Sequence, residues 1–206
     1  MAKFLTLNTH SWMEEEQESK LNQLAERILQ EKYDVICLQE VNQLVESEQV
    51  VQAPFYYAVD GAIPIHQDHY ALLLVEKLAE AGMDYYWSWA YNHIGFDIYN
   101  EGVAILSRKP LKARELLVSD VNDPSDYHTR KVLLAETELD GQPIMVASCH
   151  LSWWDKGFQG EWAKFESELL QVETPLVLMG DFNNPVDYEG YQHILQSPLA
   201  LQDSHK

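Results

Sequence analysis

Short, almost continuously apolar runs alternate along the chain with segments whose apolar positions recur at helical spacing. A run such as DVICLQ (34–39) is typical of a strand buried on both faces. Leu21, Leu24 and Ile28 instead share one helix face, after an acidic run at 14–18 that suits a helix N-terminus. The pattern predicts strands at 3–7, 34–39, 101–107, 131–139, 142–150 and 175–180, an aromatic β-prone segment at 83–93, and helices around 21–29, 69–81, 155–171 and 187–197.

Strands and helices therefore interleave, and several strands are apolar enough to lie in the middle of layers. This order predicts an α/β or α+β layered domain with helices outside the sheets. The chain of 206 residues has no internal repeat and no Gly/Ser-rich or Pro-rich linker. We therefore expect residues 1–206 to form a single domain.

Polar side chains follow four of the predicted strands, at the point where each strand ends. Asn8, Glu40 and His150 each come directly after an apolar run, and Asp181 follows PLVLMG with Asn183 two residues later. Sites in layered folds gather where strand ends and their loops meet at one rim. Amide and carboxylate side chains converging there favour a hard cation with oxygen ligands, Mg²⁺ or Mn²⁺.

Each residue alone also has a purely structural explanation. Asn8 could simply form a turn, and Glu40 could face solvent at the start of a helix. His150 could be a core histidine whose hydrogen bonds are satisfied. Asp181 is harder to explain in this way, because Gly180 and Pro185 frame a tight turn that presents it. The joint occurrence of these residues favours a site.

At this point the sequence resembles the endonuclease/exonuclease/phosphatase superfamily of metal-dependent phosphoesterases. The segments that carry the resemblance occur in the family's order and cover most of the chain: FLTLNTHSW (4–12), DVICLQEVN (34–42), EGVAILSR (101–108), ASCHLSWW (147–154) and LMGDFNNP (178–185). The tryptophans also look like a bacterial branch of sugar-phosphate phosphatases that acts on maltose 6′-phosphate. The resemblance implies a four-layer sandwich of two packed mixed β-sheets with helices outside.

The resemblance also implies roles for individual residues. Glu40 would be the principal Mg²⁺ ligand, with Asn8 beside it and Mn²⁺ as a substitute. Asp181 would orient or deprotonate the attacking water. Asn183 would hold the phosphate and that water, and His150 would donate a hydrogen bond to a non-bridging phosphate oxygen.

Glu101 and Arg130 match positions near the pocket of the family, with less defined roles in substrate binding. Phosphoryl transfer needs charge neutralisation and in-line positioning more than covalent chemistry by the protein, which agrees with this set of residues. We therefore expect direct attack by water.

The end of the chain departs from the family pattern. The family finishes with a further strand and an Asp-His pair, whereas this sequence ends at LQDSHK, too soon after GDFN for Asp203 and His205 to be that pair. We therefore expect the domain to lack its C-terminal strand and this form of the chain to be impaired.

Charge and aromatic content narrow the substrate. Lys and Arg total 14 against 33 Asp and Glu, so the formal charge of −19 opposes binding to nucleic acid or anionic membranes. A bound cation explains how such a protein receives an anion. Trp12, Trp153 and Trp154 follow the strand ends and suit a sugar ring, although core packing is the alternative for most of the aromatics.

Two histidines at zinc-like spacing, His66 and His69, form only a weak metal signal without further partners. Cys37 and Cys149 lie inside apolar runs and are expected to be buried free thiols. The sequence has no secretory signal pattern and no apolar run of ~20 residues. We therefore expect a cytoplasmic protein without a membrane anchor.

These observations predict a Mg²⁺-dependent phosphomonoesterase for a small phosphorylated sugar. Three alternatives stay open: a metal-dependent DNA or RNA endonuclease, a sphingomyelinase-like phosphodiesterase, and a non-catalytic module that binds a ligand through the same rim.

Overall fold

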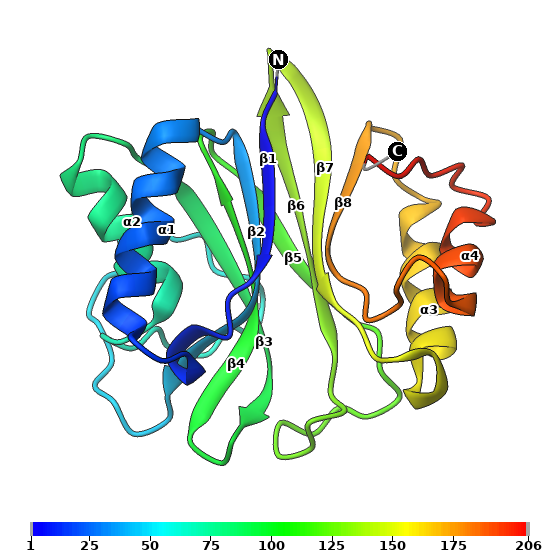
Figure 1. Ribbon diagram of the computed structural model, residues 1–206, viewed down its shortest axis with the longest axis horizontal. Helices are drawn as coiled ribbons and strands as arrows, with labels where there is room; N and C mark the ends of the chain where they lie inside the picture. Colours follow the sequence, from blue (N-terminus) through cyan, green and yellow to red (C-terminus); the bar gives the residue numbers. More distant parts are fainter. Residues whose placement is uncertain (1, 205–206) are drawn as a thin grey trace.

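The computed structural model describes residues 2–204 and contains two four-stranded β-sheets packed face to face, with helices on both outer surfaces (Figure 1). The elements in chain order are β1 (Phe4–Asn8), η1 (Ser11–Met13), α1 (Gln17–Glu31), β2 (Val35–Leu44), α2 (Tyr70–Glu80), β3 (Tyr86–Gly95), β4 (Tyr99–Ser107), β5 (Lys112–Leu117), β6 (Lys131–Leu139), β7 (Gln142–His150), η2 (Trp154–Lys156), α3 (Phe158–Leu169), β8 (Leu176–Asp181) and α4 (Glu189–Leu195). The predicted fold class of two mixed sheets between helical layers is confirmed.

The two sheets share one pattern of parallel and antiparallel pairing but differ in the order of their strands along the chain. The first has the order β1-β2-β4-β3 and the second the order β5-β6-β7-β8. Each contains one parallel pair at its edge, β1 with β2 and β7 with β8, and antiparallel pairs elsewhere. The parallel pairs place the carboxyl ends of β1 and β2, and of β7 and β8, at the same end of the sandwich (Figure 1).

Burial follows the alternation of each strand. In β2, Ile36 and Leu38 face the layer formed by α1 and α2, while Val35 and Cys37 face the second sheet. Helix α3 covers the second sheet through Phe158, Trp162 and Phe165, which are all fully buried. Both faces of the central strands are therefore covered, which explains why their sequences are almost continuously apolar.

The structure differs from the sequence prediction in three elements. Strand β5 at Lys112–Leu117 was not predicted, because KARELL is polar and lies at a sheet edge. The helix predicted over 155–171 is divided at Gly157, whose φ of 117° separates η2 from α3. Strand β2 continues past residue 39 to Leu44 through a break in its pairing register between Leu38 and Val41.

Two further expectations can be compared with the described residues. Cys37 and Cys149 are both buried and free, as expected. Among residues 2–204, every helix is too short or too polar to cross a membrane.

Candidate active site

A polar pocket of about 800 Å³ opens at the end of the sandwich where the strand-end residues meet. Both sheets contribute, and the β3–β4 turn, the 119–130 loop and the segment after β7 form the outer walls. The lining includes seven residues predicted from the sequence and the half-exposed Trp153: Asn8, Glu40, Glu101, Arg130, His150, Asp181 and Asn183. A second hollow of about 610 Å³ adjoins it along β1 and β8 and shares Asn8, Asp181, Asn183 and Trp153.

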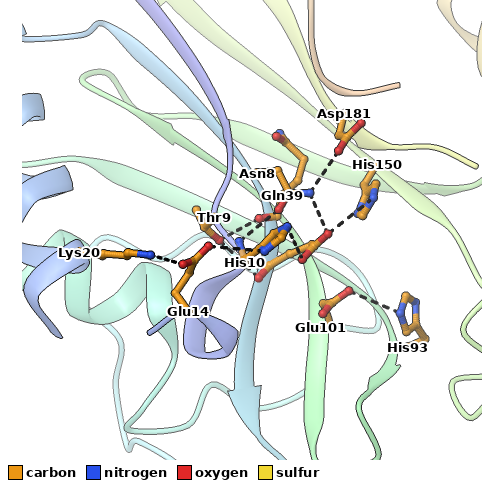
Figure 2. A network of polar contacts seen from close by, with 11 residues as sticks. Asn8, Thr9, His10, Glu14, Lys20, Gln39, His93, Glu101, His150 and Asp181 are labelled. Atoms are coloured by element: carbon orange, nitrogen blue, oxygen red, sulfur yellow. Dashed lines mark hydrogen bonds and ion pairs between the residues drawn. The ribbon is translucent and has the colours of Figure 1, made fainter. Parts of the chain in front are cut away.

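Glu40 reaches the pocket because of a β-bulge. The register of β2 against β4 breaks between Leu38 and Val41, and Glu40 has a φ of 53°. Its Oε1 accepts a hydrogen bond of 2.8 Å from Asn8 Nδ2. The same amide nitrogen donates to Asp181 Oδ2 at 3.2 Å, so Asn8 lies between the two carboxylates (Figure 2).

The turn after β8 orients Asp181. Its Oδ1 accepts the backbone N–H of Asn183 at 3.0 Å, and Asn183 has a left-handed φ of 49°. Gly180 allows β8 to approach β7 closely, since a Cβ at this position would lie 2.2 Å from the Cys149 carbonyl oxygen. The Asn183 side chain donates to the Leu151 carbonyl at 2.8 Å and so links the turn to the end of β7.

Glu101 is a buried acid on the wall of the pocket. Its Oε1 lies 3.5 Å from His93 Nε2, and both side chains are less than a tenth exposed. Burial, reinforced by the charge of Glu40, raises the pKa of Glu101 to about 7. Burial and the charge of Arg130 lower the pKa of His93 to about 4. At neutral pH the pair is therefore a neutral imidazole beside a carboxyl group near its midpoint.

His150 ends β7 in the second sheet, with Nε2 4.0 Å from Glu40 Oε1. Burial and the nearby Arg130 lower its pKa to about 4, so the ring is a neutral hydrogen-bonding group at pH 7. The guanidinium of Arg130 forms no ion pair with a carboxylate within residues 2–204, and its buried Nε has no hydrogen-bond partner.

The donor set fits a hard cation that keeps open coordination positions. Within residues 2–204, no three His, Cys, Asp or Glu side chains gather closely enough to enclose a metal ion. Glu40 offers one carboxylate, whereas the Asn8 amide oxygen accepts the His10 N–H at 3.2 Å and would have to turn towards Glu40 to join it as a ligand. Mg²⁺ sites are commonly built from one or two carboxylates completed by water and phosphate oxygens. An enclosed zinc site would need more nitrogen or sulfur ligands.

The three tryptophans predicted as substrate contacts lie in different places. Trp153 lines both hollows and is 50% exposed. Trp12 donates through Nε1 to the Asp68 carbonyl and packs edge-on against Tyr70, away from the pocket lining. Trp154 packs against Phe158 and also lies outside that lining.

The His66 and His69 pair has a structural role. His66 Nδ1 lies 2.8 Å from the Leu44 carbonyl oxygen. His69 is fully buried, begins α2 by accepting the Leu72 N–H, and packs against Trp87 and Trp89. Burial lowers its pKa to about 3. His205 lies outside the described residues.

Several lining residues had no role assigned from the sequence. His10 stands at the mouth with Nε2 3.9 Å from Glu40 Oε2 (Figure 2). The outer wall carries exposed Phe96 and Tyr127, with Lys156 and His128. These residues belong to loops with no apolar periodicity. One sequence feature pointed to His128: it lies two positions before Arg130, and in an extended segment this spacing places both side chains on the same face.

Comparisons with known proteins agree on one family. A sequence model described as the Endonuclease/Exonuclease/phosphatase family matches residues 12–204. The structure of an endonuclease/exonuclease/phosphatase family protein from Leptotrichia buccalis is 31% identical, with a TM-score of 0.82 over 96% of this chain and 73% of that chain. A comparison with curated proteins gives no match.

More distant structures share the fold alone. The human Nocturnin catalytic domain with bound sulfate anion is 19% identical, with a TM-score of 0.66 over 97% of this chain and 70% of that chain. D. rerio TDP2 in complex with a single-strand DNA product is 14% identical, with a TM-score of 0.60 over 96% of this chain and 66% of that chain.

Proposed function

The chain belongs to the endonuclease/exonuclease/phosphatase family, whose members are metal-dependent hydrolases of phosphoester bonds, and we propose that it is a Mg²⁺-dependent phosphomonoesterase for a small sugar phosphate. The observation that carries this proposal is the guanidinium of Arg130. It lies in an acidic protein of formal charge −19, lines the pocket and has no carboxylate partner within residues 2–204. A half-buried cation that lines the pocket and forms no ion pair within residues 2–204 favours a site that receives an anion.

Arg130 and His150 are the phosphate-binding groups in this proposal. Arg130 supplies a fixed positive charge with several N–H donors, and the neutral His150 donates one hydrogen bond. His150 Nε2 lies 4.0 Å from Glu40 Oε1, and Arg130 is near enough to His150 to lower its pKa. The cation would bind beside them through Glu40 and Asn8. When bound, the cation neutralises charge on the phosphoryl oxygens and on the leaving group.

Asp181 is the residue that accepts a proton from the attacking water. Hydrogen bonds from Asn183 N–H to Oδ1 and from Asn8 to Oδ2 fix its carboxylate and leave further lone pairs for the water. The water oxygen forms a bond to phosphorus while the bond to the leaving oxygen breaks, so no covalent enzyme intermediate is needed. Such preorganised hydrogen bonds are worth ~2–4 kcal/mol each in the transition state.

A small sugar phosphate suits the remainder of the pocket. Trp153 presents an exposed aromatic face beside the polar groups, and such faces are good platforms for a sugar ring. The cationic side chains in the lining, apart from histidines, are Arg130 and Lys156. A polynucleotide would need a longer basic track along its backbone.

The test is release of inorganic phosphate from maltose 6′-phosphate and glucose 6-phosphate, with bis(4-nitrophenyl) phosphate as the diester, in EDTA and in Mg²⁺. We expect Mg²⁺-dependent release from a sugar monoester, at a rate at least tenfold above that from the diester. The matched control is Glu138→Gln, an exposed acid on β6 outside the pocket, which should leave the rate unchanged.

Two results would overturn the proposal. Faster cleavage of the diester or of single-stranded DNA than of any sugar monoester would assign a phosphodiesterase. A folded protein that is inactive towards all substrates but still binds glucose 6-phosphate through Arg130 would assign a binding module.

A further inference from the structure

The 119–130 loop carries a histidine–carboxylate pair on the outer wall of the pocket. His128 Nδ1 lies 2.7 Å from Asp126 Oδ1, and the same oxygen accepts the His128 backbone N–H at 2.9 Å. This pairing engages Nδ1 and leaves Nε2 of His128, which lines the pocket, for another partner. The Tyr127 ring stacks on the imidazole with a centroid distance of 3.9 Å.

The loop that holds this pair is fixed from several sides. Thr129 Oγ1 donates to the Asp123 carbonyl and accepts the Asp123 N–H, which closes the loop upon itself. The Ile94 N–H donates to the Pro124 carbonyl at 2.7 Å and links the loop to β3. These hydrogen bonds fix the loop that carries His128, although the imidazole ring itself is about half exposed.

The strand order places this wall opposite the water-activating end. Each strand of the first sheet faces one strand of the second across the sandwich. The facing pairs that contribute pocket residues run from one edge to the other in this order: β1 with β8, β2 with β7, β4 with the start of β6, and β3 with the loop after β5. Asp181 lies at the first edge and His128 at the last. Arg130 and His150 lie between them, and three strand spacings correspond to roughly 14 Å.

In-line phosphoryl transfer needs such an arrangement. The attacking and leaving oxygens lie on opposite sides of phosphorus. With the water at Asp181 and the phosphoryl group at Arg130 and His150, the leaving oxygen points towards the wall that carries His128.

The other pocket histidines have different neighbours. Nε2 of His10 and of His150 lies within 4.0 Å of Glu40, and Nε2 of His93 lies within 3.5 Å of Glu101. His10 also pairs through Nδ1 with a carboxylate outside the lining, Glu14, at 3.5 Å. Among the pocket histidines of residues 2–204, His128 is the one whose Nε2 has no carboxylate within 4.0 Å.

Resting on the proposed function, we propose that His128, oriented by Asp126, is the general acid that protonates the leaving group. As the bond between phosphorus and the leaving oxygen breaks, its electron pair stays on that oxygen, and Nε2–H of the protonated imidazole transfers its proton to it. Asp181 takes a proton from the attacking water. Asp181 then releases its proton to solvent and His128 takes one up from solvent, so the cycle balances with an alcohol and phosphate as products.

The dependence on leaving group tests this role. A sugar alkoxide needs a proton as it departs, whereas 4-nitrophenolate is a stable anion and departs without one. For His128→Gln we expect kcat/KM on glucose 6-phosphate, or the best sugar monoester, to fall about 100-fold. On 4-nitrophenyl phosphate the fall should be less than about threefold, because general acid catalysis contributes little there.

Two further variants separate catalysis from loop structure. Asp126→Asn should show the same selectivity with a smaller fall, since the imidazole is oriented less well. Asn122→Ala changes an exposed residue of the same loop outside the pocket lining and should leave both substrates unaffected. An equal loss of activity on both substrates by His128→Gln, or no loss on the sugar phosphate, would overturn the general-acid role. A wild-type protein inactive on both would instead overturn the proposed function.

Discussion

The space between the two sheets has an apolar end and a polar end, and the same strands build both. Cys37 on β2, Ile105 on β4 and Val146 on β7 are fully buried in the apolar end. Further along the same strands, Glu40 and Glu101 belong to the pocket. Position along a strand therefore decides whether a side chain packs or reacts.

The difference shows how the fold supports a charged site. The apolar end removes hydrocarbon from water and holds the two sheets at a fixed separation. At the polar end, the same rigidity holds the carboxyl groups of Glu40 and Glu101 near one another although they repel. Burial, together with the charge of Glu40, therefore raises the pKa of Glu101. We therefore expect substitutions at the polar end to change activity, and substitutions at the apolar end to change stability.

The largest expected effect is on activity at the polar end. Glu40→Gln removes the carboxylate charge that would hold the cation while keeping the size of the side chain. We expect kcat to fall by about 10³-fold, with an unchanged midpoint of thermal unfolding in EDTA. Phosphate release and Mg²⁺ titration calorimetry measure the two parts. Retained turnover with normal Mg²⁺ affinity would place the cation elsewhere.

The next effect is on the pH dependence of the free energy of unfolding, to which the buried Glu101 contributes. Because burial raises the pKa of Glu101 to about 7 from its ordinary value of 4.5, the folded state binds this proton more tightly than the unfolded state. Its contribution to the free energy of unfolding is therefore fully present below pH 4.5 and is lost as pH rises to 7, a change of ~3 kcal/mol.

Glu101→Gln should remove that loss. In EDTA, urea unfolding between pH 4.5 and 8 should give a variant that is more stable than wild type at pH 8 and equal to it or less stable at pH 4.5. Glu138→Gln, an exposed acid, is the control and should follow the wild-type curve. Parallel curves for Glu101→Gln and wild type would contradict the buried ionisation.

A smaller effect separates charge from geometry at Arg130. Arg130→Lys keeps a positive charge but loses the planar fork of donors, whereas Arg130→Met loses both. We expect kcat/KM to fall about tenfold for the lysine variant and about 100-fold for the methionine variant. Steady-state kinetics on the sugar monoester measures both, and equal rates for the two variants would show that charge at this position is irrelevant.

The smallest effect tests the apolar end. Ile105→Val removes one buried methylene group between the sheets and should lower the free energy of unfolding by about 1 kcal/mol. Turnover well below the unfolding transition should remain that of wild type. A large loss of activity in the folded variant would mean that the two ends are coupled more tightly than their separate packing suggests.

The sequence alone determined the strands, the layers and the polar strand ends. Hydrophobic period and run length are local properties, so β4, β6, β7 and α2 could be predicted within a few residues. The order of strands followed by Asn8, Glu40, His150 and Asp181 also predicted that these residues converge at one rim, because parallel neighbours end at the same edge. Strand β5 had no such signal, since an edge strand tolerates a polar sequence.

Tertiary structure alone decided which side chains meet and what their environment does to them. The bulge that turns Glu40 into the pocket arises from pairing with β4. The burial that raises the pKa of Glu101 arises from its packing in the fold, with His93 of β3 beside it. Trp12 and Trp153 carry the same ring in similar local sequence, yet Trp12 packs against Tyr70 while Trp153 faces the pocket. Contacts across the sandwich join residues more than a hundred positions apart, and local periodicity carries no information on them.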